Sequence, residues 1–325
     1  MNRRSSLRLL AGLAVAGALP AASQITGRLP RVGVLHFGSR TNFQSRSDAL
    51  LKGLAELGYV DAKSVAITWR AANGQADLLA SYAQELGLGA VDVVVSASTH
   101  TSRALRRVNA TVPVVMASVE DPVSEGFVKA VEKPATNMTG IAASTYDHLE
   151  RHVELLMALT PRLTRITALV NPDNPSARGF RGRMQSVVRS GTRLIFANAA
   201  TVDQIEGAFP ARSRDDADGL VVMNDTLFFN ERRTITDAAA RAHRPAIYPL
   251  RAFVEAGGLM SLGPNQEANF FRAADFVDRI LKGAKPGDLP MEVSPKIELV
   301  INRDVVQNLG LQVPPEVAKQ AVLLR

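Results

Sequence analysis

The stretch VDVVVSASTHTSRALRRVNATVPVVMAS, residues 91–118, decides the fold class. It starts with the apolar run Val91–Ser96, which predicts a buried strand, and continues with a helical pattern over Thr99–Val108. A second β-branched run, Val112–Ser118, predicts another strand soon after the helix. Strand, helix and strand in close succession predict a βαβ unit, in which the two strands lie parallel.

The same alternation continues on both sides of this stretch. Upstream, apolar runs at 31–37 and 65–70 predict two further strands, and a helical pattern follows each of them. Downstream, the order of strands and helices recurs at nearly constant spacing. The offsets are 134 residues from Arg31 to Arg165, 126 from Asp92 to Asp218 and 132 from Pro113 to Pro245. We therefore predict an α/β protein of two similar Rossmann-like (flavodoxin-like) lobes, each built on a parallel sheet.

The end of the chain contains strand and helix patterns that are too short to form a third domain. They lie at 257–264, 267–282 and 297–301. We expect them to complete the two lobes, so that the chain crosses between the lobes several times. The predicted first lobe is residues 30–143 plus 260–286, and the predicted second lobe is residues 144–259 plus 296–325. Hinges are expected near 143–145 and 254–261.

Residues 1–23 have the three parts of a secretory signal peptide. Arg3, Arg4 and Arg8 form a basic start, Leu9–Leu19 is an apolar run, and Ala21–Ser23 offers small residues for cleavage. An apolar run of about eleven residues is too short for a bilayer core that needs about 20. We predict that this segment is cleaved and that the mature protein works in the periplasm. The string NRRSSLR, residues 2–8, also resembles a twin-arginine signal, so both export routes stay open.

Composition excludes several classes of function. The 325 residues contain no cysteine, which excludes disulfides, thiolate catalysis, cysteine-bound metals and a lipid anchor on cysteine. The formal charge of +7 falls to +4 without the three signal-peptide arginines, and the arginines between 162 and 193 lack the aromatic interleaving of a base-stacking platform. We therefore predict no nucleic-acid partner. His148 and His152 are spaced for one metal, but without a third ligand we expect a solvent-facing helix and no metal.

Short polar residues follow the predicted strands. Ligands of open parallel sheets bind beyond the carboxyl ends of the strands, so two facing lobes predict a cleft for a small ligand. Helix N-termini at these places suit a carboxylate, while Asp121 and Asp225 suit a cationic group, and an amino acid fits both. The alternative is that these residues only cap helices. No nucleophile elbow, phosphate loop or dinucleotide motif is present, so we predict that the protein is not an enzyme.

Motifs throughout the chain after residue 23 resemble a known family. They are LLKGLAELGY (50–59), TVPVV (111–115), DPV (121–123), NMTG (137–140), NPDNP (171–175), DTLFF (225–229), EAGGLMS (255–261), GPN (263–265), KGAKP (282–286), DLP (288–290) and ELVIN (298–302). In number and order they resemble those of the ABC transporter substrate-binding proteins, in the group that includes tryptophan-binding members. This resemblance implies a type I periplasmic binding protein fold.

The resemblance also implies a function. A monomer without cofactors would close around a small solute between its lobes and deliver it to an ABC permease in the inner membrane. The candidate ligand-binding residues are Thr99, Asp121, Asn174, Asp225 and Tyr248, with Ser98, Thr145 and Ser176 as further candidates. The implied solute is an amino acid or a related small acid. Leu262 stands where the family more usually has an aromatic residue, and His100 replaces a small one, so the resemblance does not imply an aromatic amino acid in particular.

Two alternatives to transport also stay open. In the first, the loaded protein feeds a membrane sensor or receptor. In the second, the protein is a periplasmic enzyme on the same scaffold, which acts through Asp121 or Asp225.

Overall fold

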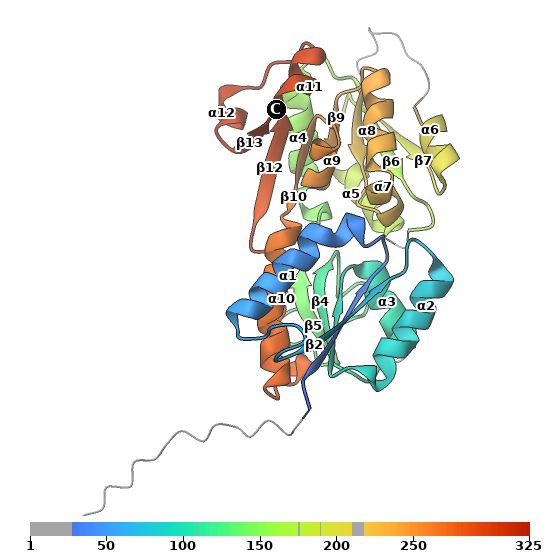
Figure 1. Ribbon diagram of the computed structural model, residues 1–325. Coiled ribbons are helices and arrows are strands. Elements are labelled where there is room, and N and C mark those ends of the chain that lie inside the picture. The colour runs from blue at the N-terminus through green and yellow to red at the C-terminus, as the bar shows by residue number, and fades with distance from the viewer. Residues whose placement is uncertain (1–27, 109, 175, 189, 210–217) are drawn as a thin grey trace, which may run out of the picture.

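The computed structural model describes residues 28–325 except 109, 175, 189 and 210–217, so the predicted signal peptide lies outside the described residues. The described residues form two α/β lobes, one above the other in Figure 1. Each lobe has a central sheet with helices on both of its faces.

Lobe I contains most of the first half of the chain and a segment from its end. Its strands are β1 (Arg31–His36), β2 (Ala66–Ala71), β3 (Val93–Ser96), β4 (Val114–Val119), β5 (Met138–Ala142) and β11 (Glu292–Val293). Its helices are α1 (Gln44–Glu56), α2 (Ala76–Glu85), α3 (Thr99–Arg107) and α10 (Gln266–Leu281), with short turns η1 (Thr41–Phe43), η2 (Leu86–Ala90) and η4 (Pro286–Asp288).

Lobe II contains the middle of the chain and its C-terminus. Its strands are β6 (Arg165–Val170), β7 (Arg193–Asn198), β8 (Asp218–Val222), β9 (Ala246–Tyr248), β10 (Met260–Pro264), β12 (Ile297–Asn302) and β13 (Ala321–Leu324). Its helices are η3 (Tyr146–His148), α4 (Leu149–Leu159), α5 (Ala177–Val187), α6 (Val202–Gly207), α7 (Thr226–Asn230), α8 (Arg232–Arg241), α9 (Arg251–Glu255), α11 (Arg303–Asn308) and α12 (Pro315–Ala318).

The two sheets have the same internal order, which confirms the predicted duplication. Among the described residues the first sheet runs β2-β1-β3-β4-β5-β11 and the second β7-β6-β8-β9-β10-β12-β13. Neighbouring strands are parallel except β10 and β12, which are antiparallel. The first five strands of each sheet follow the flavodoxin-like order. The prediction of two flavodoxin-like α/β lobes is therefore confirmed.

Strand β3 shows how the sequence produces a sheet that is buried on both faces. Val93 and Val95 pack with Leu50 of α1, whereas Val94 packs with Leu105 of α3 on the opposite face. Successive side chains of a strand point to opposite faces, so an unbroken valine run supplies both cores. This is the physical basis on which an apolar run of this kind predicts a parallel sheet.

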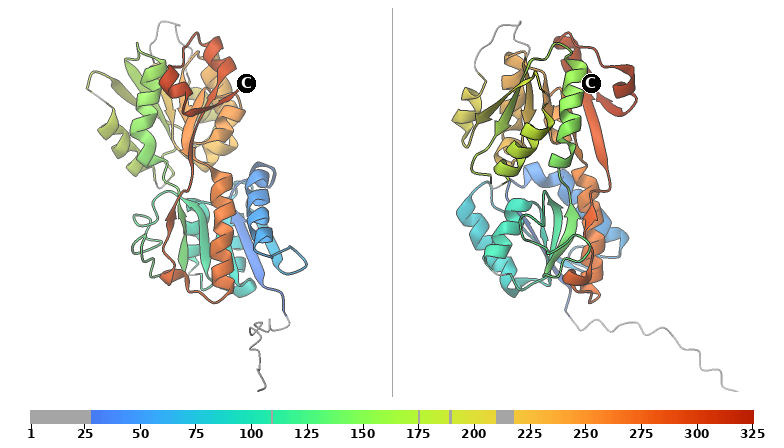
Figure 2. Two further views of the ribbon diagram at one scale, coloured as in Figure 1. Left: turned by 90° about the vertical axis from the view of Figure 1, so that its left-hand side faces the viewer. Right: turned by 180° about the vertical axis from the view of Figure 1, so that it is seen from behind.

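Helices α1 and α10 lie side by side although more than 200 residues separate them in sequence (Figures 1 and 2). Gly53 lets them approach closely, because a Cβ at this position would lie 2.5 Å from the carbonyl oxygen of Phe271. Phe270, Ala273 and Ala274 of α10 enter the same core as α1. A late segment of the chain therefore completes lobe I.

The described chain passes between the lobes at three places, and one predicted boundary was wrong. The crossings follow β5, β10 and β11, so the fifth strand of each sheet leads to a helix of the other lobe. Strand β10, residues 260–264, belongs to the sheet of lobe II and not to lobe I, because it pairs with β9 and β12. The expected hinge at 254–261 therefore lies inside lobe II, and the second and third crossings are at 264–265 and 294–296 instead.

Candidate functional site

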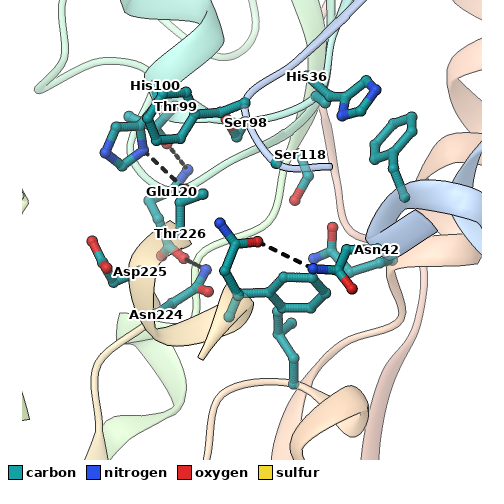
Figure 3. Close-up of a pocket in the computed structure, with 18 of the residues that line it drawn as sticks. His36, Asn42, Ser98, Thr99, His100, Ser118, Glu120, Asn224, Asp225 and Thr226 are labelled. Carbon is teal, nitrogen blue, oxygen red and sulfur yellow. Dashed lines mark hydrogen bonds between the residues drawn. The ribbon is translucent and has the colours of Figure 1, made fainter. Parts of the chain in front are cut away.

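A cavity lies between the lobes, where the carboxyl ends of the strands of both sheets meet (Figure 3). Strands β1, β3 and β4 of lobe I end beside it, as do β6 and β8 of lobe II. This edge is where open parallel sheets bind their ligands. Its polar lining residues include Ser39, Asn42, Arg46, Ser98, Thr99, His100, Ser118, Glu120, Tyr146, Asn174, Ser176, Asn224, Asp225, Thr226, Asn230 and Gln266.

Glu120 is a buried carboxylic acid in the wall of this cavity, directly after β4, and only 8% of it is exposed. Its carboxyl group accepts hydrogen bonds from the backbone N–H of Thr145 at 2.8 Å and from the Asn224 amide at 2.5 Å. Burial raises the pKa of Glu120 to about 7, against the lowering effect of these hydrogen bonds. The described groups that act on the pKa of Glu120 include no cation. A ligand with a positive charge would supply that missing partner.

The N-terminus of α3 lies at the same part of the cavity. Ser98 is its N-cap, and the Ser98 hydroxyl accepts from the backbone N–H of Thr101. The Thr99 hydroxyl accepts from the backbone N–H of Glu120 at 3.2 Å, which ties the helix to the end of β4. The first N–H groups of a helix have no partner within the helix, and they favour an anionic ligand group.

Asp225 organises the opposite wall, in lobe II. One of its carboxylate oxygens caps α7 by accepting from the backbone N–H groups of Leu227 and Phe228. The other oxygen accepts from the side-chain amides of Asn171 at 3.2 Å and Asn174 at 2.8 Å. All four hydrogen bonds lie within lobe II. They give Asp225 a structural role that holds Asn174 in the cavity wall.

Two histidines and two phenylalanines line the lobe I side of the cavity. His36 stacks on Phe43 with ring centroids 4.3 Å apart, and His100 stacks on Phe37 at 5.6 Å. Burial lowers the pKa of His36 to about 4, helped by the nearby Arg46 charge, and it also lowers the pKa of His100. Both rings are therefore neutral at pH 7 and offer flat surfaces against which an apolar or aromatic group can pack.

Side-chain hydrogen bonds join the lobes directly across the cavity. Figure 3 shows Thr226 pointing to His100, Asn224 pointing to Glu120, and Asn42 reaching across to lobe II. Among the described residues the pairs are Asn224–Glu120 at 2.5 Å, Thr226–His100 at 3.3 Å, Ser176–Glu125 at 3.3 Å, Arg232–Asn42 at 3.3 Å and Asn42–Asn230 at 3.5 Å. The relative position of the lobes is thus held by the same polar groups that face the cavity.

The structure brings five of the eight predicted site residues to the cavity. These are Ser98, Thr99, Asn174, Ser176 and Asp225. Three others do not line it, which corrects the sequence-based prediction. Thr145 is buried behind Glu120, Tyr248 is buried in the core of lobe II against Phe253, and Asp121 is exposed and accepts from the backbone N–H of Ser124.

Sequence reasoning missed Glu120 and Arg46, two ionisable side chains that line the cavity. Glu120 stands next to the chosen Asp121 in the loop after β4, and no pattern in the sequence says which of the two turns inward. Arg46 lies in the first turn of an amphipathic helix, where an arginine normally faces solvent. The expectation for His152 was also wrong, because it is buried and its Nε2 lies 2.6 Å from the carbonyl oxygen of Leu262.

Two kinds of feature are absent from the part of the chain that the structure describes. In that part, no group of three or more His, Cys, Asp or Glu residues could hold a metal ion. Nor is any helix there long and apolar enough to cross a membrane.

The fold and the cavity define a two-lobed small-ligand-binding protein of the periplasmic binding protein type. The chain belongs to the family described as ABC transporter substrate binding protein, whose model matches residues 31–323. The sequence resemblance to this family is thereby confirmed.

Individual relatives agree with the family assignment. The chain is 23% identical to a tyrosine-binding protein of Clostridioides difficile over 86% of this chain and 81% of the relative. A conserved domain protein from Vibrio cholerae has 27% identity and a TM-score of 0.84, and an ABC domain in complex with L-Trp from Streptococcus pneumonia has 26% and 0.83. Both structures cover 92% of this chain and are themselves covered completely.

Proposed function

We propose that this protein is the solute-binding component of an ABC importer and that it binds an amino acid between its lobes. The observation that carries the proposal is Glu120, a buried carboxyl group in the cavity wall on which no cationic group of the described residues acts. The ammonium group of an amino acid matches it, and the N-terminus of α3 beside Thr99 suits the carboxylate. Relatives that bind tyrosine and tryptophan support the same class of ligand.

The arrangement of the lobes supports binding by closure. The cavity draws its lining from both lobes, and the described chain connects them by three crossings, which act as a hinge. Opening at this hinge would expose the strand ends, and closing would exclude water and strengthen the polar contacts to the ligand. The closed, loaded form would be the form that the permease recognises.

The proposal also covers the export, the location and the oligomeric state of the protein. The segment 1–23 acts as a cleaved signal peptide, the mature protein works in the periplasm, and it does so as a monomer. The family membership supports the location, since a substrate-binding protein of an ABC transporter works beside the membrane.

A thermal-shift screen of the mature protein against the twenty amino acids and small carboxylic acids tests the proposal. A true ligand at about 100 times its Kd should stabilise the folded state by about 2.7 kcal/mol, because it binds only the folded form. Release of mature protein from the periplasm of an expressing cell tests the location. If no amino acid raises the melting temperature and a screen for turnover finds activity, the protein is the periplasmic enzyme of the alternative hypothesis.

A further inference from the structure

The end of the cavity away from Glu120 is formed by η1 and α1 of lobe I and by α7 of lobe II. Figure 3 shows Asn42 and His36 on the other side of the cavity from Asn224 and Asp225. This end continues into an adjoining groove between the lobes, and six residues line both spaces. They are Asn42, Arg46, Phe229, Asn230, Leu250 and Gln266.

Arg46 is the cation at this end, and it is held between rings from both lobes. Its guanidinium carbon lies 4.9 Å from the ring centroid of Phe43 in lobe I and 4.7 Å from that of Phe229 in lobe II. One terminal nitrogen donates to the carbonyl oxygen of Asn42 at 2.8 Å. A guanidinium carries five N–H donors, so this single hydrogen bond leaves others free for a ligand.

No carboxylate of the described residues neutralises Arg46 by an ion pair. Glu267 acts on Arg46 electrostatically, but its carboxylate accepts from the hydroxyl of Ser45 at 2.8 Å. Burial lowers the pKa of Arg46 to about 10, so the group still carries its charge at pH 7. Cation–π contacts supply part of the missing stabilisation, and a ligand acceptor would supply more.

The charges of the cavity are separated along its length. Of the described residues that line it, the two carboxylic acids are Glu120 and Asp225, which lie at one end in Figure 3, and the one arginine is Arg46, which lies beside Asn42 at the other end. The amide side chains of Asn42, Asn230 and Gln266 accompany Arg46. An amino acid that places its ammonium group beside Glu120 therefore directs its side chain toward a positive, hydrogen-bond-donating end.

We propose that Arg46 donates hydrogen bonds to an acceptor at the tip of the ligand's side chain, so that the ligand is an amino acid whose side chain ends in a carboxylate or a phenol hydroxyl. This inference rests on the proposed function. Both tips share the chemistry that a guanidinium recognises, namely an oxygen acceptor. The rings of His36, Phe43 and Phe229 can pack against either an aliphatic or an aromatic side-chain stem, and the experiment separates the two.

A purely structural role for Arg46 is the rival explanation. Because its guanidinium touches rings of both lobes, Arg46 could serve only to hold the lobes together. Loss of such a structural contact would weaken the binding of all ligands by the same factor. Loss of a ligand contact would instead reduce the preference for ligands that carry the acceptor.

Matched ligand pairs measure that preference directly. Isothermal titration at pH 8 compares L-tyrosine with L-phenylalanine and L-glutamate with L-norvaline, which differ mainly at the tip of the side chain. In at least one pair, the acceptor-bearing member should bind wild-type protein at least about tenfold more tightly, the effect expected of a hydrogen bond to a charged group. Arg46→Met, which keeps a flexible apolar stem but removes all donors, should bring the ratio close to one.

Arg232→Met is the matched control. Arg232 also lies over the Phe229 ring, at 4.9 Å, and donates to the side-chain oxygen of Asn42 at 3.3 Å, but it lines the adjoining groove and not the cavity, so its loss disturbs the same ring and amide without removing a donor from the cavity lining. Its loss should change the affinity for both ligands of a pair by the same factor and so preserve the ratio of their Kd values. Arg46→Lys keeps the charge without the planar fork and should retain part of the preference, while the melting temperature of each unliganded variant shows that it is folded.

Each outcome decides one of the two proposals. If no amino acid binds the wild-type protein, the proposed function itself fails. If amino acids bind but neither pair shows a preference for the acceptor, or if Arg46→Met keeps the wild-type ratio, this inference fails while the proposed function stands. A ratio that collapses in Arg46→Met and survives in Arg232→Met supports the inference.

Discussion

Ligand binding should depend on pH because it requires the ionised form of Glu120. With the lobes in the described arrangement, burial raises the pKa of this group to about 7, so it is partly protonated near neutrality. The ammonium group of a bound amino acid would stabilise the carboxylate and lower its pKa. Binding should therefore release a proton at pH values below about 7 and strengthen as the pH rises through this range.

The size of the effect follows from the pKa of Glu120 in the absence of the ligand's ammonium group. With a value of about 7, the ionised fraction falls from about nine tenths at pH 8 to about one tenth at pH 6, so Kd should rise about tenfold over this range, or about 1.4 kcal/mol. Substitution Glu120→Gln preserves the shape of the side chain but removes its charge. It should weaken binding at pH 8 by about 1.5–3 kcal/mol and abolish the pH dependence.

Isothermal titration of an identified ligand from pH 6 to 8 gives Kd. Repetition in buffers with different ionisation enthalpies gives the number of protons released, which should be close to one half at pH 7 if the pKa is about 7. Other titratable groups face Glu120 or the cavity around it, namely Asp147, Tyr146, His100, Glu125 with its partner Arg103, and Asp225. Burial raises the pKa of Tyr146 and lowers that of His100, so both stay neutral between pH 7 and 8.

Two results would refute this reasoning. One is a Kd that stays constant between pH 6 and 8 in the wild-type protein. The other is a pH dependence that persists unchanged in Glu120→Gln, which would assign the proton to a different group. His100→Gln serves as the control, since it should leave the slope between pH 7 and 8 intact.

Three other substitutions test the structure. Asp121→Ala should change ligand affinity by less than about twofold, because this side chain is exposed outside the cavity, and titration beside Glu120→Gln checks it. Gly140→Ala should destabilise the protein by more than about 2 kcal/mol in urea unfolding, because φ is +135° and a Cβ would lie 2.1 Å from the Met116 carbonyl oxygen. Asp218→Asn should destabilise the protein by more than about 1.5 kcal/mol by the same measurement, since it removes the carboxylate charge that lies 3.2 Å from the buried Arg244 guanidinium, and wild-type stability would contradict that role.

The cavity can be both polar and adaptable because its two walls belong to different lobes, which the proposed hinge connects. Its walls are built on rigid strand ends and helix N-termini, whereas three short crossings connect them. The interlobe contacts at the cavity include single hydrogen bonds between side chains, such as Thr226 to His100 and Asn42 to Asn230. Such bonds contribute little individually, so a ligand can replace them on closure.

Local patterns predicted most strands and helices of this fold. The run at 91–96 became β3, and the pattern at 267–282 became α10 within one residue at each end. The strand β5 (Met138–Ala142) had no apolar run long enough to reveal it, since Thr139 and Gly140 interrupt it. Strand β11 is only two residues long and is defined by its partner β5. Elements of this kind exist because of a neighbour rather than a local preference.

The candidate site was predictable as a location but only partly as a set of residues. The position of Thr99, Asn174 and Asp225 in strand-end loops correctly predicted that they lie at the cavity, because parallel strands bring their carboxyl ends to one edge of the sheet. Tyr248 also ends a strand, yet it turns into the core of lobe II. The direction in which a side chain points at a strand end depends on how the next helix packs, and the sequence of the loop does not specify that packing.

The sequence by itself determined that this chain forms two duplicated α/β lobes with a polar cleft, because the periodicity of apolar residues fixes which faces are buried. Only the tertiary structure decided that β10 completes lobe II while α10 completes lobe I, since strand pairing and helix packing are contacts between distant segments. It also decided that Glu120, and not Asp121, faces the cavity. Adjacent carboxylates look alike in sequence, and the environment that gives one of them a pKa of about 7 is assembled by both lobes.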